Sequence, residues 1–449
     1  MSKKFSVIIK SKIKKFSKKI RIPGDKSLSL RSLIIASQCI GISKIKNLLE
    51  SEDVLNCKKA LNSLGVKINK INNIYYVYGN GLNSFKVKKN INKIYVGNSG
   101  TTARLLSGLL ATSPGKFYLY GDSSMNRRDM SRVSKHLEKI GCFFYPKNKK
   151  NLPLKIEGTN MPLAQKHVEN LGSGQVKSSI LLAALNTPGT TIVEEKKISR
   201  NHTEIFLKEI KADIKIKKYK KKNLIYLTGQ KNIFGFNYNI SSDPSSSAFF
   251  IALTLLTPKS KLLIKNVNCN PTRIGFINLL RKKMNAKIKI KILKKKLNGE
   301  LVGDILIKSS KLKPINCPKN LVPFLIDEFP ILFMISAVTK GISKFSGINE
   351  LRHKESDRIK NIELGLNKLG IKTKSTSGSL KIFGIPNIKV KEKINIYSNN
   401  DHRIAMAWTI LALVLGGKFK IHNFETVKTS FPNFIPVIKN LGGKIEIKK

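Results

Sequence analysis

The stretch "LNSLGVKINK", residues 61–70, decides the fold because its pattern recurs along the chain. It is typical of a helix end, a turn at Gly65 and a short strand in which polar and apolar residues alternate. Related stretches occupy 136–145, 206–216, 279–290, 365–374 and 437–447, with turns at 141, 211, 285, 370 and 442. Successive turns lie 70 to 85 residues apart. A repeat of this length predicts six related structural units.

A second series of motifs runs in step with the first, because a small polar cluster opens an apolar helix in each unit. The clusters are "PGDKSLS" near 24, "GNSGTT" at 97, "SGQVKSS" at 173, "DPSSSAF" at 243, "IDEFP" at 326 and "NDHRIA" at 400. Two helical segments and several strands per unit predict an α/β fold in two layers.

Helix capping explains the Ser, Asp and Asn residues of these clusters, but not the cations that lie within a turn or two of several of them. Those cations are Lys26, Arg31, Arg104, Lys177 and Arg403. Helix N-termini attract anions. If the six helix starts face one place, they form a funnel for a small molecule with several negative charges. A capped helix with a solvated basic face stays an equal alternative for residues 21–33.

Length and composition set the general class of the protein. A chain of 449 residues with 41% hydrophobic residues predicts two or three domains with sizeable cores. The net charge of +57 usually suggests nucleic acid, but lysines occur on nearly every segment rather than in one stripe. We interpret most of this charge as compositional drift, with non-specific polyanion binding as a by-product. The lysine-rich stretches 217–223 and 291–300 are predicted to be exposed loops without a function.

Several classes of protein are disfavoured by the sequence. The sequence contains no run of 18 apolar residues, so no membrane span is expected. The five cysteines are scattered without a CxxC pair, which suits a reducing compartment and offers no zinc site. The basic N-terminus resembles a transit peptide in composition but alternates like a strand. We expect a cytoplasmic protein without a cleaved leader.

Four polar stretches in the first half carry candidate anion-binding residues. "VGNSGTTARLL", 96–106, resembles a phosphate cradle without the GK[ST] of a Walker loop, and an ordinary capped turn is the alternative. "GDSSMNRRDMSRV", 121–133, brings Arg127 and Arg128, whose forks suit carboxylate or phosphate. Ser173 and Gln175 in "LGSGQVKSSILLAAL" and Arg200 in "ISRNHTE" add hydrogen-bond donors, although a plain helix cap explains the former equally well.

The second half adds candidate proton handlers. Asp327 and Glu328 lie between apolar runs, where an acid is typically retained for a partner or for proton transfer. Glu355 stands in the charge-dense stretch 348–366, which a salt-bridged helix face also explains. Candidate anion clamps across the chain are Lys26, Arg128, Lys354, Arg358, Arg403 and Lys428. The pattern favours acid–base chemistry on a multiply anionic substrate, without a metal or redox cofactor.

The ordered motifs resemble the 5-enolpyruvylshikimate-3-phosphate (EPSP) synthases, in the style of their class II branch, over essentially the whole chain. The motifs are "RIPGDKSLSLRS", "GNSGTTARL", "GQVKSSILLAALNTPG", "DPSSSAFF", "NPTRIG", "IDEFPIL", "ELRHKESDR", "NDHRIAM" and "TSFPNF". The resemblance implies a two-domain fold of six βαβαββ units, three per domain, with helix N-termini facing an interdomain cleft that closes on substrate. It places one domain at 1–23 plus 243–449 and the other at 24–242.

The resemblance implies that phosphoenolpyruvate donates its enolpyruvyl group to the 5-hydroxyl of shikimate 3-phosphate, in the pathway to chorismate and aromatic amino acids. The partners are then these two small molecules, with no cofactor, no specific nucleic acid and no membrane, and the chain is expected to be a monomer. The expected ligands of shikimate 3-phosphate are Lys26, Ser27, Arg31, Ser173, Gln175, Arg200, Asp327 and Lys354. The expected ligands of phosphoenolpyruvate are Lys26, Gly100, Arg128, Gln175, Arg358, Arg403 and Lys428.

The resemblance also assigns the chemical steps. Lys26 contacts both substrates, Asp327 lies near the attacking 5-hydroxyl, and Glu355 exchanges a proton with the enol methylene carbon. This chain departs from the family pattern at two positions. Asp129 stands where a proline is usual, and the loss of that proline is expected to loosen Arg128. His353 stands where an aliphatic residue is usual. Lys428 aligns less closely than the other residues. Gly100 stands where glyphosate-tolerant class II relatives carry alanine, so glyphosate sensitivity is expected.

Two alternatives belong to other functions. The sister enzyme that modifies UDP-N-acetylglucosamine has asparagine after the first lysine and a cysteine-bearing loop, whereas this chain has Ser27 and no cysteine within 121–133. A basic RNA-binding protein would need aromatic-lined basic surfaces, for which the sequence gives no pattern.

Overall fold

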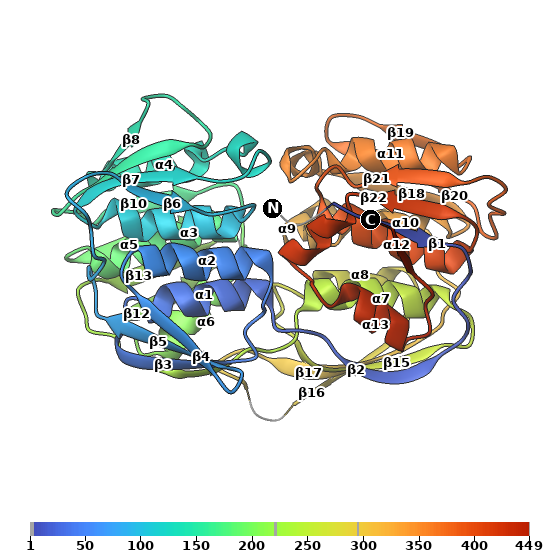
Figure 1. Ribbon diagram of the computed structural model, residues 1–449, viewed down its shortest axis with the longest axis horizontal. Coiled ribbons are helices and arrows are strands. Elements are labelled where there is room, and N and C mark those ends of the chain that lie inside the picture. The colour runs from blue at the N-terminus through green and yellow to red at the C-terminus, as the bar shows by residue number, and fades with distance from the viewer. Residues whose placement is uncertain (1–3, 220–221, 294–295, 449) are drawn as a thin grey trace. The chain divides into compact units, whose positions relative to one another are not determined.

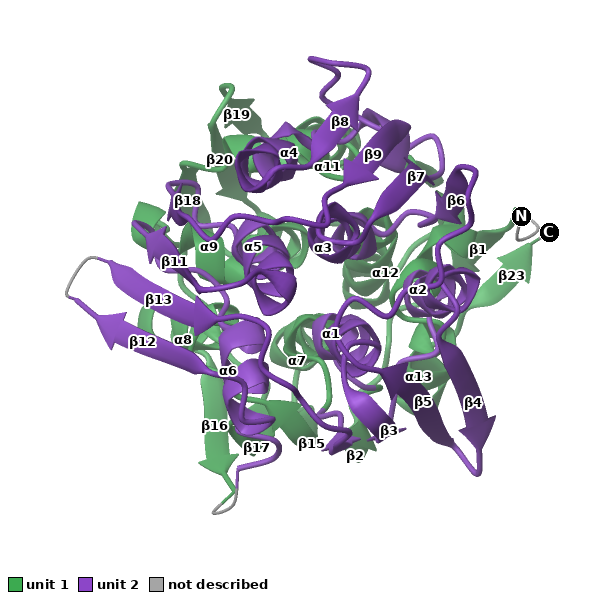
Figure 2. Cartoon of the chain, turned by 90° about the vertical axis from the view of Figure 1, so that its left-hand side faces the viewer, with its two compact units in different colours: residues 1–23, 242–295, 301–449 green, residues 24–241, 296–300 purple. Residues whose placement is uncertain are grey.

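The structure is a computed structural model that describes residues 4–219, 222–293 and 296–448 (Figure 1). The chain divides into two compact units, drawn in separate colours in Figure 2. Unit 1 comprises Met1–Pro23, Ser242–Lys295 and Leu301–Lys449, and unit 2 comprises Gly24–Ser241 and Lys296–Glu300. These ranges differ from the sequence-based division at Ser242 and at the segment Lys296–Glu300, which joins unit 2.

Unit 2 contains three four-stranded sheets of the same design, in which a parallel pair is extended by an antiparallel hairpin. The first has the order β14 (Asn237–Asn239), β3 (Ile40–Lys46), β5 (Ile74–Asn80), β4 (Lys67–Ile71). The second has the order β6 (Asn92–Tyr95), β7 (Gly115–Tyr120), β9 (Leu154–Gly158), β8 (Phe143–Tyr145). The third has the order β10 (Lys166–Glu169), β11 (Thr190–Glu195), β13 (Asn223–Thr228), β12 (Ile214–Lys218).

Unit 1 repeats the design with one reduction. Two of its sheets have the orders β2 (Ser17–Arg21), β15 (Lys261–Asn268), β17 (Val302–Lys308), β16 (Lys287–Ile292) and β21 (Ile394–Tyr397), β22 (Phe419–His422), β1 (Ser6–Ile9), β23 (Glu446–Lys448). The third has only β18 (Gly341–Ser346), β20 (Ser379–Gly384) and β19 (Thr373–Ser375). In this sheet the parallel partner of β18 is reduced to a single bridge between Asn316 and Lys344.

The six predicted turns are confirmed. Their residues all adopt positive φ, between 60° and 105°, and they are Gly65, Gly141, Lys211, Asn285, Gly370 and Gly442. Each turn leads into the outermost strand of one sheet, namely β4, β8, β12, β16, β19 and β23. A residue in the left-handed region ends a helix and reverses the chain, which is why glycine or asparagine stands at five of the six turns.

Helices form the second layer of each unit (Figure 2). In unit 2 the buried helices are α1 (Lys26–Ala36), α3 (Gly100–Ala111) and α5 (Gly174–Asn186), and the others are α2 (Glu52–Ser63), η1 (Met125–Arg127), α4 (Ser131–Leu137), η2 (Glu138–Ile140) and α6 (His202–Glu209). In unit 1 the buried helices are α7 (Pro244–Leu256), α10 (Phe329–Ala337) and α12 (His402–Leu415). Its other helices are α8 (Gly275–Lys283), η3 (Lys319–Leu321), α9 (Val322–Leu325), η4 (Asn349–His353), α11 (Arg358–Lys368), η5 (Phe424–Thr429) and α13 (Phe434–Asn440).

Each buried helix starts at one of the six polar clusters identified in the sequence. Side chains of Asp25, Ser99, Ser173, Asp243 and Asp401 accept backbone N–H bonds at the starts of α1, α3, α5, α7 and α12. These helices are apolar on nearly every face, so they sit in the hydrophobic core of their unit. The fold therefore presents the polar chemistry of the chain at helix starts that are themselves anchored in a rigid core.

The prediction of an exposed loop at 291–300 is wrong for its last residues. Glu300 is buried, and its carboxylate lies 2.6 Å from Nδ1 of His202. Asn298 donates a side-chain hydrogen bond to the backbone oxygen of Asn239. The segment joins unit 2 because Glu300 finds a buried partner there. Residues 294–295, and residues 220–221 of the other lysine-rich stretch, lie outside the described residues.

Membrane-spanning potential is confined to one broken pair. Among the described residues, no single helix is long and apolar enough to cross a membrane. The segments Lys319–Leu325 and Phe329–Ala337 have the length and apolar composition of a membrane span only when they are taken together, and the pair is bent by 116°.

Two histidines of unit 2 form a buried contact. The rings of His136 on α4 and His167 on β10 meet edge to face, with centroids 5.6 Å apart. His167 is 1% exposed, and neither of its ring nitrogens has a hydrogen-bond partner among the described residues. Burial, with smaller effects of His136 and Lys139, lowers the pKa of His167 to about 4. The fold therefore holds this ring neutral over a wide pH range.

The neutral ring of His167 predicts that the folded protein loses stability in acid. Because the folded pKa of His167 lies below its unfolded value near 6.5, folding excludes a proton. The stability from this site is present above pH 6.5 and is lost as the pH falls towards 4. Urea midpoints of wild type should therefore drop between pH 7 and pH 4.5, and His167→Phe should show a smaller drop. Equal drops in the two proteins would contradict this origin.

Candidate active site

The start of α1 places Lys26 against an acid. Asp25 caps the helix by accepting the N–H of Leu28 at 2.9 Å, which fixes Lys26 as its first residue. The Lys26 ammonium lies 3.0 Å from Oδ2 of Asp53 in the first turn of α2, and the two side chains are 18% and 6% exposed. Asp53 thus positions a mostly buried cation beside the helix N-terminus, and Ser27 follows in the same turn.

Arg31 joins three helices. Its Nε donates to Thr203 of α6 at 2.8 Å, and its Nη2 donates to Ser178 of α5 at 2.9 Å. Its Nη1 donates to the backbone oxygen of Ser27 at 3.1 Å. These bonds place the first two turns of α1 beside the starts of α5 and α6.

The starts of α3 and α5 are joined by Gln175. Its Oε1 accepts a hydrogen bond from Arg104 at 2.5 Å, and its Nε2 donates to Thr101 at 2.8 Å. Arg128 bonds Asn98 through Nη2 and lies over Gly100, since a Cβ on Gly100 would be 3.0 Å from Nη1 of Arg128. The structure therefore brings together the residues predicted at Gly100, Arg128 and Gln175.

Asp129 was expected to loosen Arg128, but its contacts hold this segment in place. Its carboxylate accepts the N–H of Ser131 at 2.7 Å, and its backbone oxygen accepts a hydrogen bond from Arg104 at 2.9 Å. Its backbone also bridges Asn151. The segment that carries Arg128 is therefore fixed on both sides, and the Asp129 carboxylate accepts a hydrogen bond that a proline side chain could not.

Ser173 is held at the start of α5 by a buried carboxylate. Glu169 accepts the backbone N–H groups of Leu171, Gly172 and Ser173 at 2.9, 2.8 and 3.2 Å. The Ser173 hydroxyl oxygen accepts the N–H of Val176. Its O–H hydrogen remains available to a ligand, because that bond uses only a lone pair.

In unit 1, Asp327 and Arg403 come together ahead of α10. Nη1 of Arg403 donates to the backbone oxygen of Asp327 at 3.1 Å, and Nη2 lies 3.8 Å from its carboxylate. Because Arg403 is in the first turn of α12, this contact aligns the starts of α10 and α12. Glu328, singled out with Asp327, is buried at the start of α10.

Glu355, Arg358 and Asp401 form a buried chain of charges. Nε of Arg358 lies 2.8 Å from Oδ2 of Asp401, and its Nη2 lies 2.6 Å from Oε2 of Glu355. Burial disfavours this cation, but Asp401 and Glu355 outweigh burial and raise the pKa of Arg358. Nη1 of Arg358 is buried and has no hydrogen-bond partner among the described residues. This nitrogen of a permanent cation therefore has hydrogen-bonding capacity that the described residues do not use.

Lys354 and His353 precede this chain of charges. The Lys354 ammonium lies 3.6 Å from Glu350, and partial burial lowers its pKa against the opposing pull of Glu350 and Asp327. His353, where this chain departs from the family pattern, is exposed.

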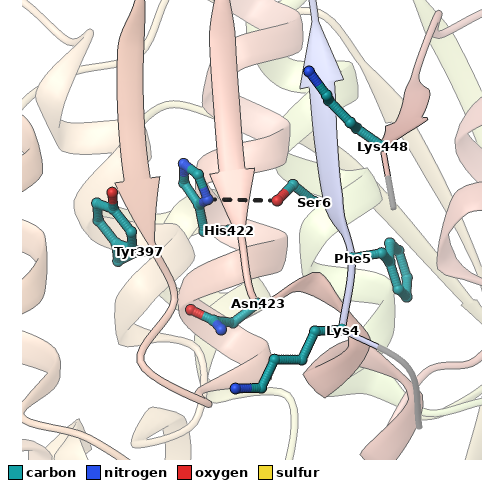
Figure 3. A pocket seen from close by; sticks show the side chains of 7 residues that line it. All are labelled: Lys4, Phe5, Ser6, Tyr397, His422, Asn423 and Lys448. Atoms are coloured by element: carbon teal, nitrogen blue, oxygen red, sulfur yellow. Dashed lines mark hydrogen bonds between the residues drawn. The ribbon is translucent and has the colours of Figure 1, made fainter.

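Lys428 is not joined to the other predicted residues. It is exposed on η5, and its ammonium lies 5.7 Å from the ring centroid of Phe5. Phe5 lines a cavity of about 290 Å³ at the β21–β22–β1–β23 sheet, together with Tyr397, His422 and four other residues (Figure 3). None of the predicted site residues lines this cavity.

Sequence reasoning missed the acids that hold the cations. Asp53 and Asp401 were not selected, although each stands in the first turn or at the cap of a helix, which is a recognisable signal. Arg273 in "NPTRIG" was also left without a role, and it bonds Asp243 and Ser245 at the start of α7. The missing information was which distant acid faces which cation.

Known proteins match the whole chain. The sequence model of the family described as EPSP synthase (3-phosphoshikimate 1-carboxyvinyltransferase) matches residues 10–438. A 3-phosphoshikimate 1-carboxyvinyltransferase of Ruthia magnifica is 40% identical over 429 residues, covering 95% of this chain and 96% of the relative. The protein of the same name from Petrotoga mobilis is 42% identical over 427 residues, covering 94% and 96%.

Solved structures agree with the sequence comparisons. An EPSP synthase from Acinetobacter baumannii is 35% identical, has a TM-score of 0.84, and covers 99% of this chain and 100% of its own. The enolpyruvyl transferase NikO of Streptomyces tendae has a TM-score of 0.75 at 13% identity, with 99% of each chain covered. The NikO likeness supports the two-domain α/β fold alone.

Asp401 generates a stability prediction. Asp401→Asn removes the charge that holds Arg358 and should cost about 3 kcal/mol, as expected when one partner of a buried pair is lost. Asp357→Asn is the matched control, since Asp357 pairs with Arg352 at the surface and should cost less than about 1 kcal/mol. Urea unfolding of both variants measures the difference. An Asp401→Asn protein as stable as the control would contradict the importance of this buried pair.

Proposed function

Because this chain belongs to the EPSP synthase family, we propose that it transfers the enolpyruvyl group of phosphoenolpyruvate to the 5-hydroxyl of shikimate 3-phosphate and releases phosphate. The product leads to chorismate and the aromatic amino acids. The observation that carries the proposal is a set of cations held by acids at helix starts, with Nη1 of the buried Arg358 lacking a hydrogen-bond partner among the described residues. Such sites fit substrates that carry phosphate and carboxylate groups.

Shikimate 3-phosphate is assigned to the residues around the starts of α1 and α5, with two more residues from unit 1. Hydrogen-bond donors for its phosphate and ring are Lys26, Ser27, Arg31, Ser173, Gln175 and Arg200. Asp327 and Lys354 bind its hydroxyls. The contacts of Arg31 with Ser178 and Thr203 support this assignment, because they fix the helices that carry the other donors.

Phosphoenolpyruvate is assigned to a second set of cations. Lys26 contacts it as well as shikimate 3-phosphate, and the other residues are Gly100, Arg128, Gln175, Arg358, Arg403 and Lys428. Lys428 is the least supported of these, because its ammonium lies over Phe5. Arg128 over the backbone of Gly100 offers a guanidinium and N–H groups of a helix start to one anionic group.

The reaction proceeds by addition and then elimination. The 5-hydroxyl gives its proton to Asp327 as its oxygen bonds to C2 of phosphoenolpyruvate, while protonated Glu355 gives a proton to C3, which becomes a methyl group. In the tetrahedral intermediate so formed, the Glu355 carboxylate takes a proton back from that methyl group as the bond from C2 to the phosphate oxygen breaks. The departing phosphate takes up the proton held by Asp327, so enolpyruvyl shikimate 3-phosphate and phosphate result. Arg358, bonded to Glu355 at 2.6 Å, fixes the position of this carboxyl group for both proton transfers.

Finer properties are part of the proposal. We assign the chain to the class II style of the family, with no cofactor or metal, acting in the cytoplasm as a monomer on these two small molecules. Binding to nucleic acid is assigned to non-specific attraction of the +57 charge, and no membrane partner is proposed.

One assay tests the function. Purified protein is mixed with phosphoenolpyruvate and either shikimate 3-phosphate or UDP-N-acetylglucosamine, and released phosphate is measured. Release with shikimate 3-phosphate that requires both substrates supports the proposal. Release only with the sugar nucleotide would assign the chain to the sister reaction instead.

Lys26→Met should lower turnover by at least about a hundredfold, as expected for a lost electrostatic contact in the transition state. Asp53→Asn is the matched control, because it breaks the same ion pair but leaves the ammonium, and it should lose much less turnover. Steady-state kinetics of both variants make the comparison. Equal losses would mean that Lys26 acts only through its contact with Asp53.

Glu355→Gln keeps the shape of the side chain but removes its role as a proton carrier. Turnover should fall by about a hundredfold or more, in the range of general acid–base effects, while the KM for shikimate 3-phosphate changes little. A variant in which only the Michaelis constants change would remove Glu355 from proton transfer.

Gly100→Ala should weaken glyphosate more than phosphoenolpyruvate. The added methyl would lie 3.0 Å from Nη1 of Arg128 and 3.4 Å from Nη1 of Arg104, so it displaces guanidiniums from the anion site. Glyphosate is the longer ligand and tolerates the loss of space less. Inhibition curves at matched phosphoenolpyruvate saturation compare the two proteins. Wild type that resists millimolar glyphosate, or unchanged curves for the variant, would place Gly100 away from the site.

A further inference from the structure

Lys177 is the centre of a buried ion cluster that the proposed reaction does not use. Its ammonium lies 2.6 Å from Oε1 of Glu195 and 2.7 Å from Oε1 of Glu204. The three side chains are 0%, 0% and 3% exposed. Burial disfavours the cation, but the two carboxylates outweigh burial and raise the pKa of Lys177. The cluster is therefore a charged triad inside unit 2.

The two glutamates stand at opposite ends of the loop that carries Arg200. Glu195 is the last residue of β11, and Glu204 lies in the first turn of α6, with residues 196–201 between these elements. Glu195 also accepts the N–H and the hydroxyl of Ser199, at 2.8 and 2.5 Å. A single ammonium therefore holds both ends of this short loop.

Lys177 also lies on the helix that presents two other predicted substrate ligands. It follows Ser173 by four residues and Gln175 by two on α5. The backbone of Arg200 packs directly on that helix start, since a Cβ on Gly174 would be 3.0 Å from the Arg200 oxygen. The triad thus connects the Arg200 loop to the start of α5.

We propose that Lys177 is a positioning residue for shikimate 3-phosphate, holding the Arg200 loop against α5 so that Arg200 and Ser173 keep a fixed geometry. This inference rests on the proposed function and assigns Lys177 no contact with substrate. Without the ammonium, the two buried carboxylates repel each other and the loop ends separate. Arg200 must then be ordered by the substrate itself, which weakens binding.

The test uses a variant that keeps the charge of the triad. Lys177→Met alone leaves two buried carboxylates without a cation and is expected to impair folding. The double variant Lys177→Met/Glu204→Gln has the same net charge as the wild-type triad and removes the connection. Glu195 keeps its hydrogen bond from Asn223 at 2.9 Å, and His202 keeps Glu300, so β11 and α6 retain other anchors.

The expected result is a selective loss. The KM for shikimate 3-phosphate should rise at least about tenfold in the double variant, while kcat and the KM for phosphoenolpyruvate stay within about threefold. Lys166→Met is the control, because it removes an exposed lysine from Glu194, the residue next to Glu195, while Glu194 keeps its pair with Lys222, and it should change none of these. A double variant with unchanged KM for shikimate 3-phosphate, or with kcat and both KM values reduced or raised together, would overturn the proposal.

A mutant cycle shows whether Lys177 acts through Arg200. Arg200→Ala should weaken binding of shikimate 3-phosphate strongly in wild type and only slightly in the double variant, because the positioned guanidinium is already lost there. Additive effects, or no effect of Arg200→Ala in wild type, would overturn the positioning role. Calorimetric titration of the four proteins reads this coupling without turnover. If the wild-type protein binds shikimate 3-phosphate but releases no phosphate, the proposed function is contradicted. The binding measurements of the mutant cycle would still decide whether Lys177 positions Arg200.

Discussion

A cation at the start of a helix needs an acid to hold it, because the N–H groups already make that end positive. This constraint organises both units. Lys26 is held by Asp53, Arg403 by Asp327, and Arg358 by Asp401. Each acid fixes its cation in place before a ligand binds, so that a ligand does not have to order these side chains itself.

The shortage of acids makes this arrangement informative. The chain has 84 lysines and arginines but only 27 acids, and several acids are buried. Glu169 organises the turn before α5, while Glu195 and Glu204 hold Lys177. These buried acids thus stand beside a helix start or a cation, whereas most lysines are exposed to solvent.

Local patterns explain why the fold was predictable from the sequence. A turn residue between a helix end and an alternating strand depends only on neighbouring residues, so the turns at Gly65, Gly141 and the other four positions were found correctly. Pairings between distant residues were not predictable. Asp401 meets Arg358 across 43 residues, and Glu300 meets His202 across 98, and no local pattern encodes either contact. The same reason explains why Asp53 was missed although Lys26 was chosen.

The central claim is that acid-held cations at helix starts form a site for the phosphate of the substrate. Isothermal titration of the wild-type protein with shikimate 3-phosphate and with shikimate, at low and at physiological salt, tests it most directly. The account predicts that shikimate 3-phosphate binds at least about a hundredfold more tightly than shikimate, with the advantage shrinking as salt rises. Equal affinity for the two compounds, independent of salt, would contradict it.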